Sequence, residues 1–93
     1  MPNLPSAKKR MRIEEKRRAR NRSIKSAVRT QVTQARNAMA ANPNEPITLE
    51  AVQEALRALD RGVSKGVLHR NNAARRKSRL MARLHKLQAQ AGA

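Results

Sequence analysis

Few residues in this sequence have the chemistry of a metal site. The chain has no cysteine and two histidines, His69 and His85, which lie 16 positions apart. Zinc sites in proteins are built from closely spaced Cys and His side chains, so we expect no metal. His85 is expected to face solvent. His69, beside Arg70, can either hydrogen-bond a phosphate or a 2′-hydroxyl group or serve as an ordinary turn residue.

The acidic residues give no catalytic arrangement either. Those of the middle segment include no spaced pair beside a nucleophile or base, and the sequence has no glycine-rich phosphate loop. We expect them to cap helix termini and to pair with Arg57 and Arg61. The sequence therefore predicts no enzyme activity and no cofactor. The residues concerned are Glu45, Glu50, Glu54 and Asp60.

Positive charge is the chemistry that dominates the chain. Residues 1–36 carry 12 basic and 2 acidic side chains, residues 37–60 carry 1 and 4, and residues 61–93 carry 9 and 0, for a net charge of +16. Charge segregated in this way destabilises a folded domain unless a polyanion neutralises it. The sequence contains no Phe, Tyr or Trp, which excludes base stacking on these side chains. Binding to phosphates is therefore predicted.

A long first helix is expected to hold the N-terminal basic residues. Ser6 offers an N-cap hydroxyl, and nothing breaks the helical pattern before residues 42–46, which predicts a helix over residues 7–41. Its second half has apolar residues on one face, whereas positions 8–22 have no such stripe. We therefore expect the second half to pack and the first half to project and bind. The predicted packing residues are Ile24, Ala27, Val28, Val32, Ala35 and Met39.

Two shorter helices are expected to follow. The second is predicted at about residues 48–65, with Thr48 as N-cap and Gly66 in the left-handed position after its end. Its apolar stripe is Leu49, Val52, Leu56, Leu59 and Val63. The third is predicted at about residues 70–90, with Ala73, Ala74, Leu80, Met81, Leu84 and Leu87 inward. The predicted fold class is all-α, a three-helix bundle with a long, projecting N-terminal helix, in one domain of residues 1–93.

Residues 71–79 partly match the basic region of leucine-zipper DNA-binding proteins. The matching positions are Asn71, Ala74, Ser78 and Arg79, and Arg75 stands where an alanine belongs. Such proteins need several heptads after the basic region, whereas here the apolar heptad positions are limited to Leu80 and Leu87. We therefore interpret the match as accidental.

Four segments resemble a known family. They are SAKKR at 6–10, EKRR at 15–18, SAVRT at 26–30 and, above all, VSKGVLHRNNAARRKSRL at 63–80. In register from about residue 2 to residue 87, the chain resembles the bacterial small-subunit ribosomal protein number twenty family (bS20). The resemblance implies a three-helix protein that binds small-subunit ribosomal RNA early in assembly and bridges the 5′ domain and the long penultimate stem.

The resemblance also implies a cytoplasmic protein of the ribosome. Its partners would be small-subunit ribosomal RNA and neighbouring ribosomal components, and it would be a monomer there, with no membrane contact and no small-molecule substrate. The residues expected to bind ribosomal RNA are Ser6, Lys8, Lys9, Arg10, Arg12, Lys16, Arg17, Arg18, Arg20, Asn21, Arg22, Ser23, Lys25, Ser26, Arg29, Lys65, Gly66, His69, Arg70, Asn71, Arg75, Arg76, Lys77, Ser78, Arg79 and Arg83.

Two other classes of protein share the chain's positive charge. A histone-like protein that compacts DNA accounts for the charge equally well. A membrane-active basic peptide accounts for the amphipathic helices, but the absence of Trp and Phe argues against it.

Overall fold

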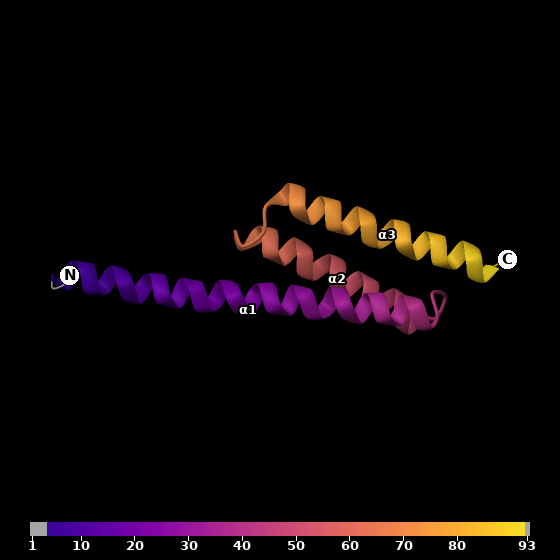
Figure 1. Cartoon of the computed structure of the whole chain (residues 1–93), viewed down its shortest axis with the longest axis horizontal. Helices are drawn as coiled ribbons and strands as arrows, with labels where there is room; N and C mark the ends of the chain where they lie inside the picture. The colour runs from indigo at the N-terminus through magenta and orange to yellow at the C-terminus, as the bar shows by residue number, and fades with distance from the viewer. Residues whose placement is uncertain (1–3, 93) are drawn as a thin grey trace.

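The computed structural model describes residues 4–92, and this part of the chain folds into three α-helices: α1 (Pro5–Ala41), α2 (Pro46–Ser64) and α3 (Arg70–Gly92). Successive helices run in opposite directions (Figure 1). The predicted fold class, an all-α three-helix bundle with a long N-terminal helix, is confirmed. The molecule measures 67 × 21 × 17 Å, because α1 continues well beyond the end of the helix bundle (Figure 1).

Prolines begin the first two helices. Pro5 and Pro46 occupy the first helical turn, where the missing N–H costs no hydrogen bond and the fixed φ suits the helix. The residues before them have extended backbones and make no capping hydrogen bond with their side chains. The predictions of Ser6 and Thr48 as N-caps were therefore wrong. Thr48 is instead buried, and its hydroxyl donates to backbone carbonyls at the end of α1.

The end of α2 was predicted correctly. Gly66 has φ +74°, the left-handed conformation that glycine adopts without a steric penalty. Its N–H donates to the Val63 carbonyl at 3.0 Å, and the Val67 N–H donates to the Gly62 carbonyl at 2.9 Å. These two bonds form a Schellman motif. A Cβ at Gly62 would lie 2.7 Å from Leu68 Cδ1, so the missing side chain lets the turn pack directly on the helix.

The core is thin and contains many small side chains. Most residues predicted to face inward do so, but Ala27, Leu49 and Ala74 are exposed. On α2 the buried face includes Val52 and Leu59 of the predicted stripe and extends to Ala55 and Ala58, whose small side chains contribute to the two core clusters. The buried hydrophobic residues are Val28, Ala35, Met39, Val52, Ala55, Ala58, Leu59, Ala73, Leu80 and Leu84.

The two halves of α1 differ as predicted. Every residue from Lys8 to Arg20 is exposed, whereas the buried residues of this helix all lie in its second half. Arg20 Nη2 donates to the Lys65 carbonyl at 3.3 Å, which ties α1 to the C-terminal end of α2. The helix leaves the bundle near this contact. We call residues 5–19 the projecting half of α1.

Candidate nucleic-acid interface

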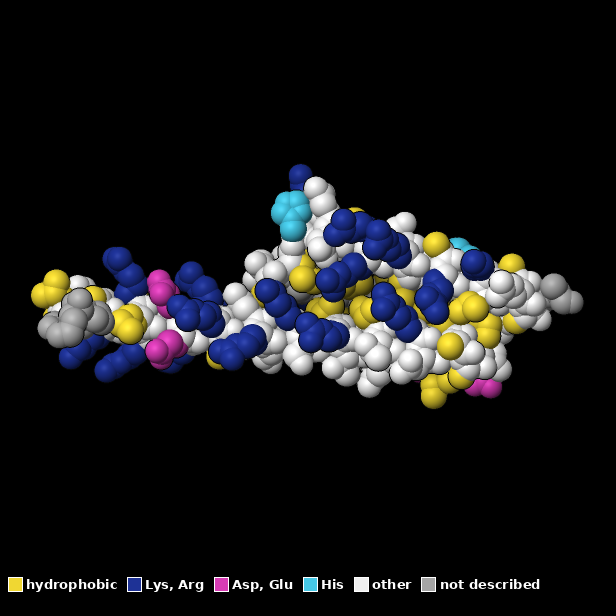
Figure 2. All heavy atoms as spheres, in the orientation of Figure 1, with side chains coloured by type: hydrophobic (Ala, Val, Ile, Leu, Met, Phe, Trp, Pro, Cys, Tyr) yellow, Lys and Arg dark blue, Asp and Glu magenta, His cyan; other side chains and the backbone are white. Residues whose placement is uncertain are grey.

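A groove runs between α1 and α3, where Lys and Arg side chains lie over apolar surface (Figure 2). It consists of three adjoining hollows. The first hollow, which includes Val67 and Leu68 of the turn between α2 and α3, shares Arg29 and Arg76 with the second. The second shares Arg36 and Arg79 with the third, which includes Arg83 and Lys86 of α3. We call it the basic groove. Its basic residues are Lys25, Arg29 and Arg36 of α1 and Arg76, Arg79, Arg83 and Lys86 of α3, and its apolar residues include Val28, Val32 and Leu80.

Helical periodicity places these charges in two rows. Residues three, four or seven positions apart lie on the same face of a helix, and the basic residues of each wall follow this spacing. None of the residues that line the three hollows is acidic. The two rows therefore repel each other across the groove, and an anion between them removes the repulsion.

The sequence analysis missed two basic residues of the groove. Arg36 follows Arg29 by seven positions, and Lys86 follows Arg79 by seven positions. Seven residues are close to two helical turns, so each missed residue continues a row of predicted ones. Extending each predicted row by this spacing would have found both residues.

The projecting half of α1 forms a second basic surface, separate from the groove. Because successive residues are rotated by about 100°, the neighbours Lys16, Arg17 and Arg18 point to three different sides of the helix. A carboxylate oxygen of Glu14 lies 3.9 Å from a guanidinium nitrogen of Arg18, and both side chains are more than half exposed. Such exposed pairs contribute little to stability. The surface thus offers uncompensated positive charge around its whole circumference.

Several predicted site residues lie outside both basic surfaces. Lys77 Nζ lies 2.9 Å from Asp60 Oδ1 and so links α3 to α2. Arg70 and Lys77 both line a hollow between these two helices, away from α1. Lys65 lines a separate hollow between α1 and α2, and Gly66 lies in the turn that ends α2. Positions outside the groove lining that are nevertheless exposed on the surface are Ser23, Ser26, Asn71, Arg75 and Ser78.

His69 has a structural role at the start of α3. Its Nδ1 accepts a hydrogen bond of 3.1 Å from the Asn71 N–H, which satisfies a free donor of the first helical turn. The acceptor at Nδ1 places the proton of the neutral ring on Nε2. His69 and His85 are both exposed. Of the two roles considered in the sequence analysis, the structural one at the turn is therefore observed for His69.

Two further features bear on the class of protein. Within residues 4–92, His, Asp and Glu side chains do not gather into a group of three that could hold a metal ion. None of the helices described is long and apolar enough to cross a membrane.

Comparison with known proteins identifies the family. A family model described as Ribosomal protein S20 matches residues 2–85. The chain belongs to the ribosomal protein S20 family. The chain is 48% identical over 89 residues to the small ribosomal subunit protein bS20 of Thermobifida fusca, with 95% of each chain covered. This confirms the resemblance seen in the sequence.

Other members of the ribosomal protein S20 family are similarly close. The protein of the same name from Thermotoga neapolitana is 42% identical over 85 residues, covering 91% of this chain and 86% of the relative. The protein of that name from Clostridium perfringens is 48% identical over 85 residues, covering 91% of this chain and 97% of the relative. Members of this family are structural proteins of the ribosome and not enzymes, so the prediction that the chain is not an enzyme is confirmed.

Proposed function

We propose that this protein is a structural component of the small ribosomal subunit that binds small-subunit ribosomal RNA directly and bridges separate RNA segments during assembly. The observation that supports this most strongly is the basic groove, with seven Lys and Arg residues and no acidic residue along its walls. The relatives are named as proteins of the small ribosomal subunit, and we therefore infer that ribosomal RNA is the polyanion that this chain binds. The other proposed partners are neighbouring components of the ribosome, and the proposed location is the cytoplasm.

In the groove, phosphates of one RNA segment lie between the two basic rows. Each guanidinium group can donate two parallel hydrogen bonds to one phosphate, which fixes the position of the RNA backbone as well as neutralising it. Five of the seven basic residues in the groove are arginines. Binding in the groove therefore depends on the shape and phosphate positions of the RNA more than on base sequence.

The projecting half of α1 binds a second RNA segment. An isolated helix with no packing face is barely stable in water, and repulsion between its charges destabilises it further. Its basic residues face all sides, so RNA that surrounds the helix neutralises more of them than RNA on one side. We therefore place the projecting half between two RNA segments, and we place the helix bundle on the surface of one of these segments.

Binding measurements across salt concentrations test this function. The full chain is titrated with small-subunit ribosomal RNA, with duplex DNA as competitor. We expect the logarithm of the affinity to fall with the logarithm of the salt concentration with a slope of magnitude roughly 5 or more. Stronger binding to the DNA than to the RNA, at physiological salt, would instead favour a DNA-compacting protein.

A double variant of the groove provides the matched comparison. Arg29→Gln with Arg79→Gln removes one charge from each wall, and we expect the slope to fall by about 2. Arg57→Gln with Arg61→Gln removes the same charge from α2, outside the groove, and leaves the slope almost unchanged. Equal losses in the two double variants would mean that the groove is not the binding surface.

A further inference from the structure

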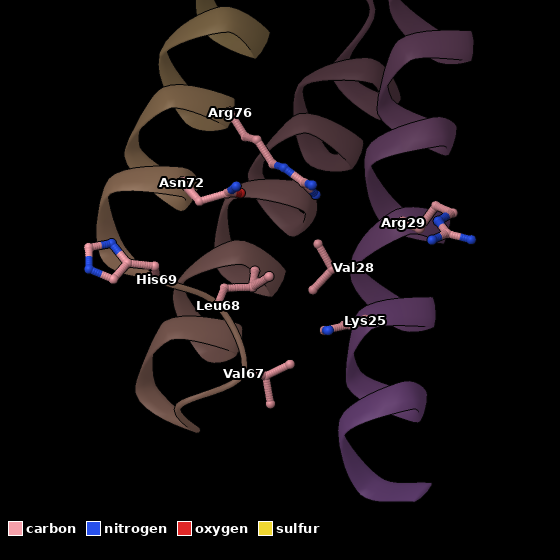
Figure 3. A pocket seen from close by; sticks show the side chains of 8 residues that line it. All are labelled: Lys25, Val28, Arg29, Val67, Leu68, His69, Asn72 and Arg76. Carbon is pink, nitrogen blue, oxygen red and sulfur yellow. The ribbon is translucent and has the colours of Figure 1, made fainter. Parts of the chain in front are cut away.

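The first hollow of the basic groove differs from the other two in its lining. It lies where α1, the turn between α2 and α3, and the start of α3 meet, and Figure 3 shows side chains from all three pointing toward it. Its volume is about 340 Å³, within the range of about 300 to 1,000 Å³ typical of small-ligand sites. Val28, Val67 and Leu68 give it an apolar wall.

Asn72 brings an unpaired polar atom to this hollow. Its side chain extends from α3 toward the middle of the hollow (Figure 3). The oxygen Oδ1 is buried and has no hydrogen-bond partner within residues 4–92. Buried acceptors in proteins almost always have a donor, from the protein, from water or from a ligand. The Asn72 carboxamide is therefore ready to accept a hydrogen bond that the protein itself does not supply.

Three basic residues also line the hollow. Lys25 and Arg29 come from α1 and Arg76 from α3, and no acidic residue lines the hollow. The Arg76 side chain reaches across the hollow from α3 toward α1 (Figure 3). A ligand that matches this lining has a flat body with apolar faces, a hydrogen-bonding edge and a nearby negative charge.

We propose that this hollow binds one unstacked nucleotide of the ribosomal RNA. Its base lies against Val28, Val67 and Leu68, and its edge pairs with the Asn72 carboxamide. A carboxamide matches any base edge with an N–H beside an acceptor, as in the bidentate pairing of Asn with adenine N6 and N7. The flanking phosphates contact Lys25, Arg29 and Arg76. This site rests on the RNA binding proposed above and adds a contact to a base.

Entry of the base requires a small rearrangement. Because Oδ1 is screened from solvent, the Asn72 or the Arg76 side chain has to turn before a base edge can reach it. Arg76 is exposed, and its planar guanidinium group can stack on the face of the base after it moves aside. The apolar wall and the guanidinium then hold the base in a chain that has no aromatic side chain.

The test uses the full chain with Asn72→Leu, which removes both polar atoms of the side chain at similar size. Its affinity for small-subunit ribosomal RNA is measured across salt concentrations, and base edges and RNA backbone are probed chemically. We expect roughly 5- to 150-fold weaker binding with an unchanged salt slope. One base edge protected by the unsubstituted protein becomes reactive, while backbone protection in the groove persists. The unbound variant melts no lower than the original protein, because an unpaired buried acceptor is gone.

Two further variants make the result decisive. Asn72→Ala cannot overfill the hollow and is expected to show the same loss, whereas Gln53→Leu, which removes an exposed carboxamide on α2, changes nothing. Affinity and base protection unchanged in both Asn72 variants would overturn the nucleotide site and leave the groove intact, since water alone would then satisfy Oδ1. No salt-dependent binding by the unsubstituted protein would overturn both proposals.

Discussion

The hydroxyl of Thr48 lies 2.6 Å from the carbonyl oxygen of Asn42, with the Ala38 carbonyl oxygen 3.3 Å away. A residue near the start of α2 thus satisfies the Asn42 carbonyl, just past the last residue of α1 and without a partner in that helix, whereas the Ala38 carbonyl already accepts the Asn42 N–H at 2.9 Å. Thr48 is 2% exposed, so water does not compete for its hydroxyl. This contact fixes the turn between the two helices from the inside.

Thr48→Val is expected to lower the free energy of unfolding by about 1 to 3 kcal/mol, because it keeps the shape of the side chain but removes the donor. The measurement is a denaturant titration at high salt, which screens the repulsion between basic residues. Thr30→Val is the control, since Thr30 is exposed on α1 and its change stays within about 0.5 kcal/mol. Equal stability of the two variants would contradict the role assigned to Thr48.

Leu59→Ala is expected to destabilise the protein more than any other leucine substitution on α2. Leu59 is 0% exposed and belongs to the core cluster shared by the three helices, so its truncation costs about 2 to 5 kcal/mol. Leu49, on the same helix, is 40% exposed. Because its truncation removes little buried surface, Leu49→Ala is expected to cost less than about 1 kcal/mol. Thermal melts of both variants at high salt check this order, and a reversed order would mean that Leu49, and not Leu59, faces the core.

The projecting half of α1 is expected to be frayed in the free protein. It has no buried residue to hold it, and its charges repel one another. Hydrogen exchange read by mass spectrometry is expected to show fast exchange of amides 8–19 without RNA and slow exchange with RNA. Amides 24–41, which include the buried positions of α1, serve as the internal control and stay protected in both states. Strong protection of residues 8–19 in the free protein would contradict this expectation.

The two basic surfaces are expected to contact different RNA segments. Arg17→Gln with Arg18→Gln neutralises part of the projecting half, and Arg76→Gln with Arg79→Gln neutralises part of the groove. Each double variant is expected to weaken binding and to lower the salt slope by about 2. Hydroxyl-radical footprinting of the two complexes locates the losses. Loss of protection at the same nucleotides in both variants would rule out bridging by these surfaces.

The sequence predicted those features that depend on local patterns. The breaks in helical periodicity located all three helices, Gly66 located the end of α2, and the missing apolar stripe at residues 8–22 indicated the projection. The starts at Pro5 and Pro46 were missed, because a hydroxyl N-cap and a proline in the first turn are competing signals only one to two residues apart.

The remaining features depend on how the helices pack. The sequence analysis left Ala55 and Ala58 out of the buried face of α2, because these residues are only weakly hydrophobic, and wrongly included Leu49. The basic groove lies between two helices that are distant in sequence, so no local pattern shows that Arg29 and Arg76 line the same hollow. For the same reason, the sequence did not reveal that Lys77 pairs with Asp60 across the α2–α3 contact.

The unbroken course of α1 from the projecting half into the bundle has a consequence for sequence length. A continuous helix transmits rotation as well as distance, so the tip and the groove keep a fixed angular phase about the helix axis. Inserting one residue near position 21 would advance the tip by only ~1.5 Å but turn it by about 100°. Inserting seven residues would advance it by about 10 Å and restore its orientation to within about 20°. On the function proposed above, this helix sets the angle between the two RNA-binding surfaces, and we expect insertions of about seven, eleven or eighteen residues, which return the tip to within about 20°, to be tolerated better than other lengths.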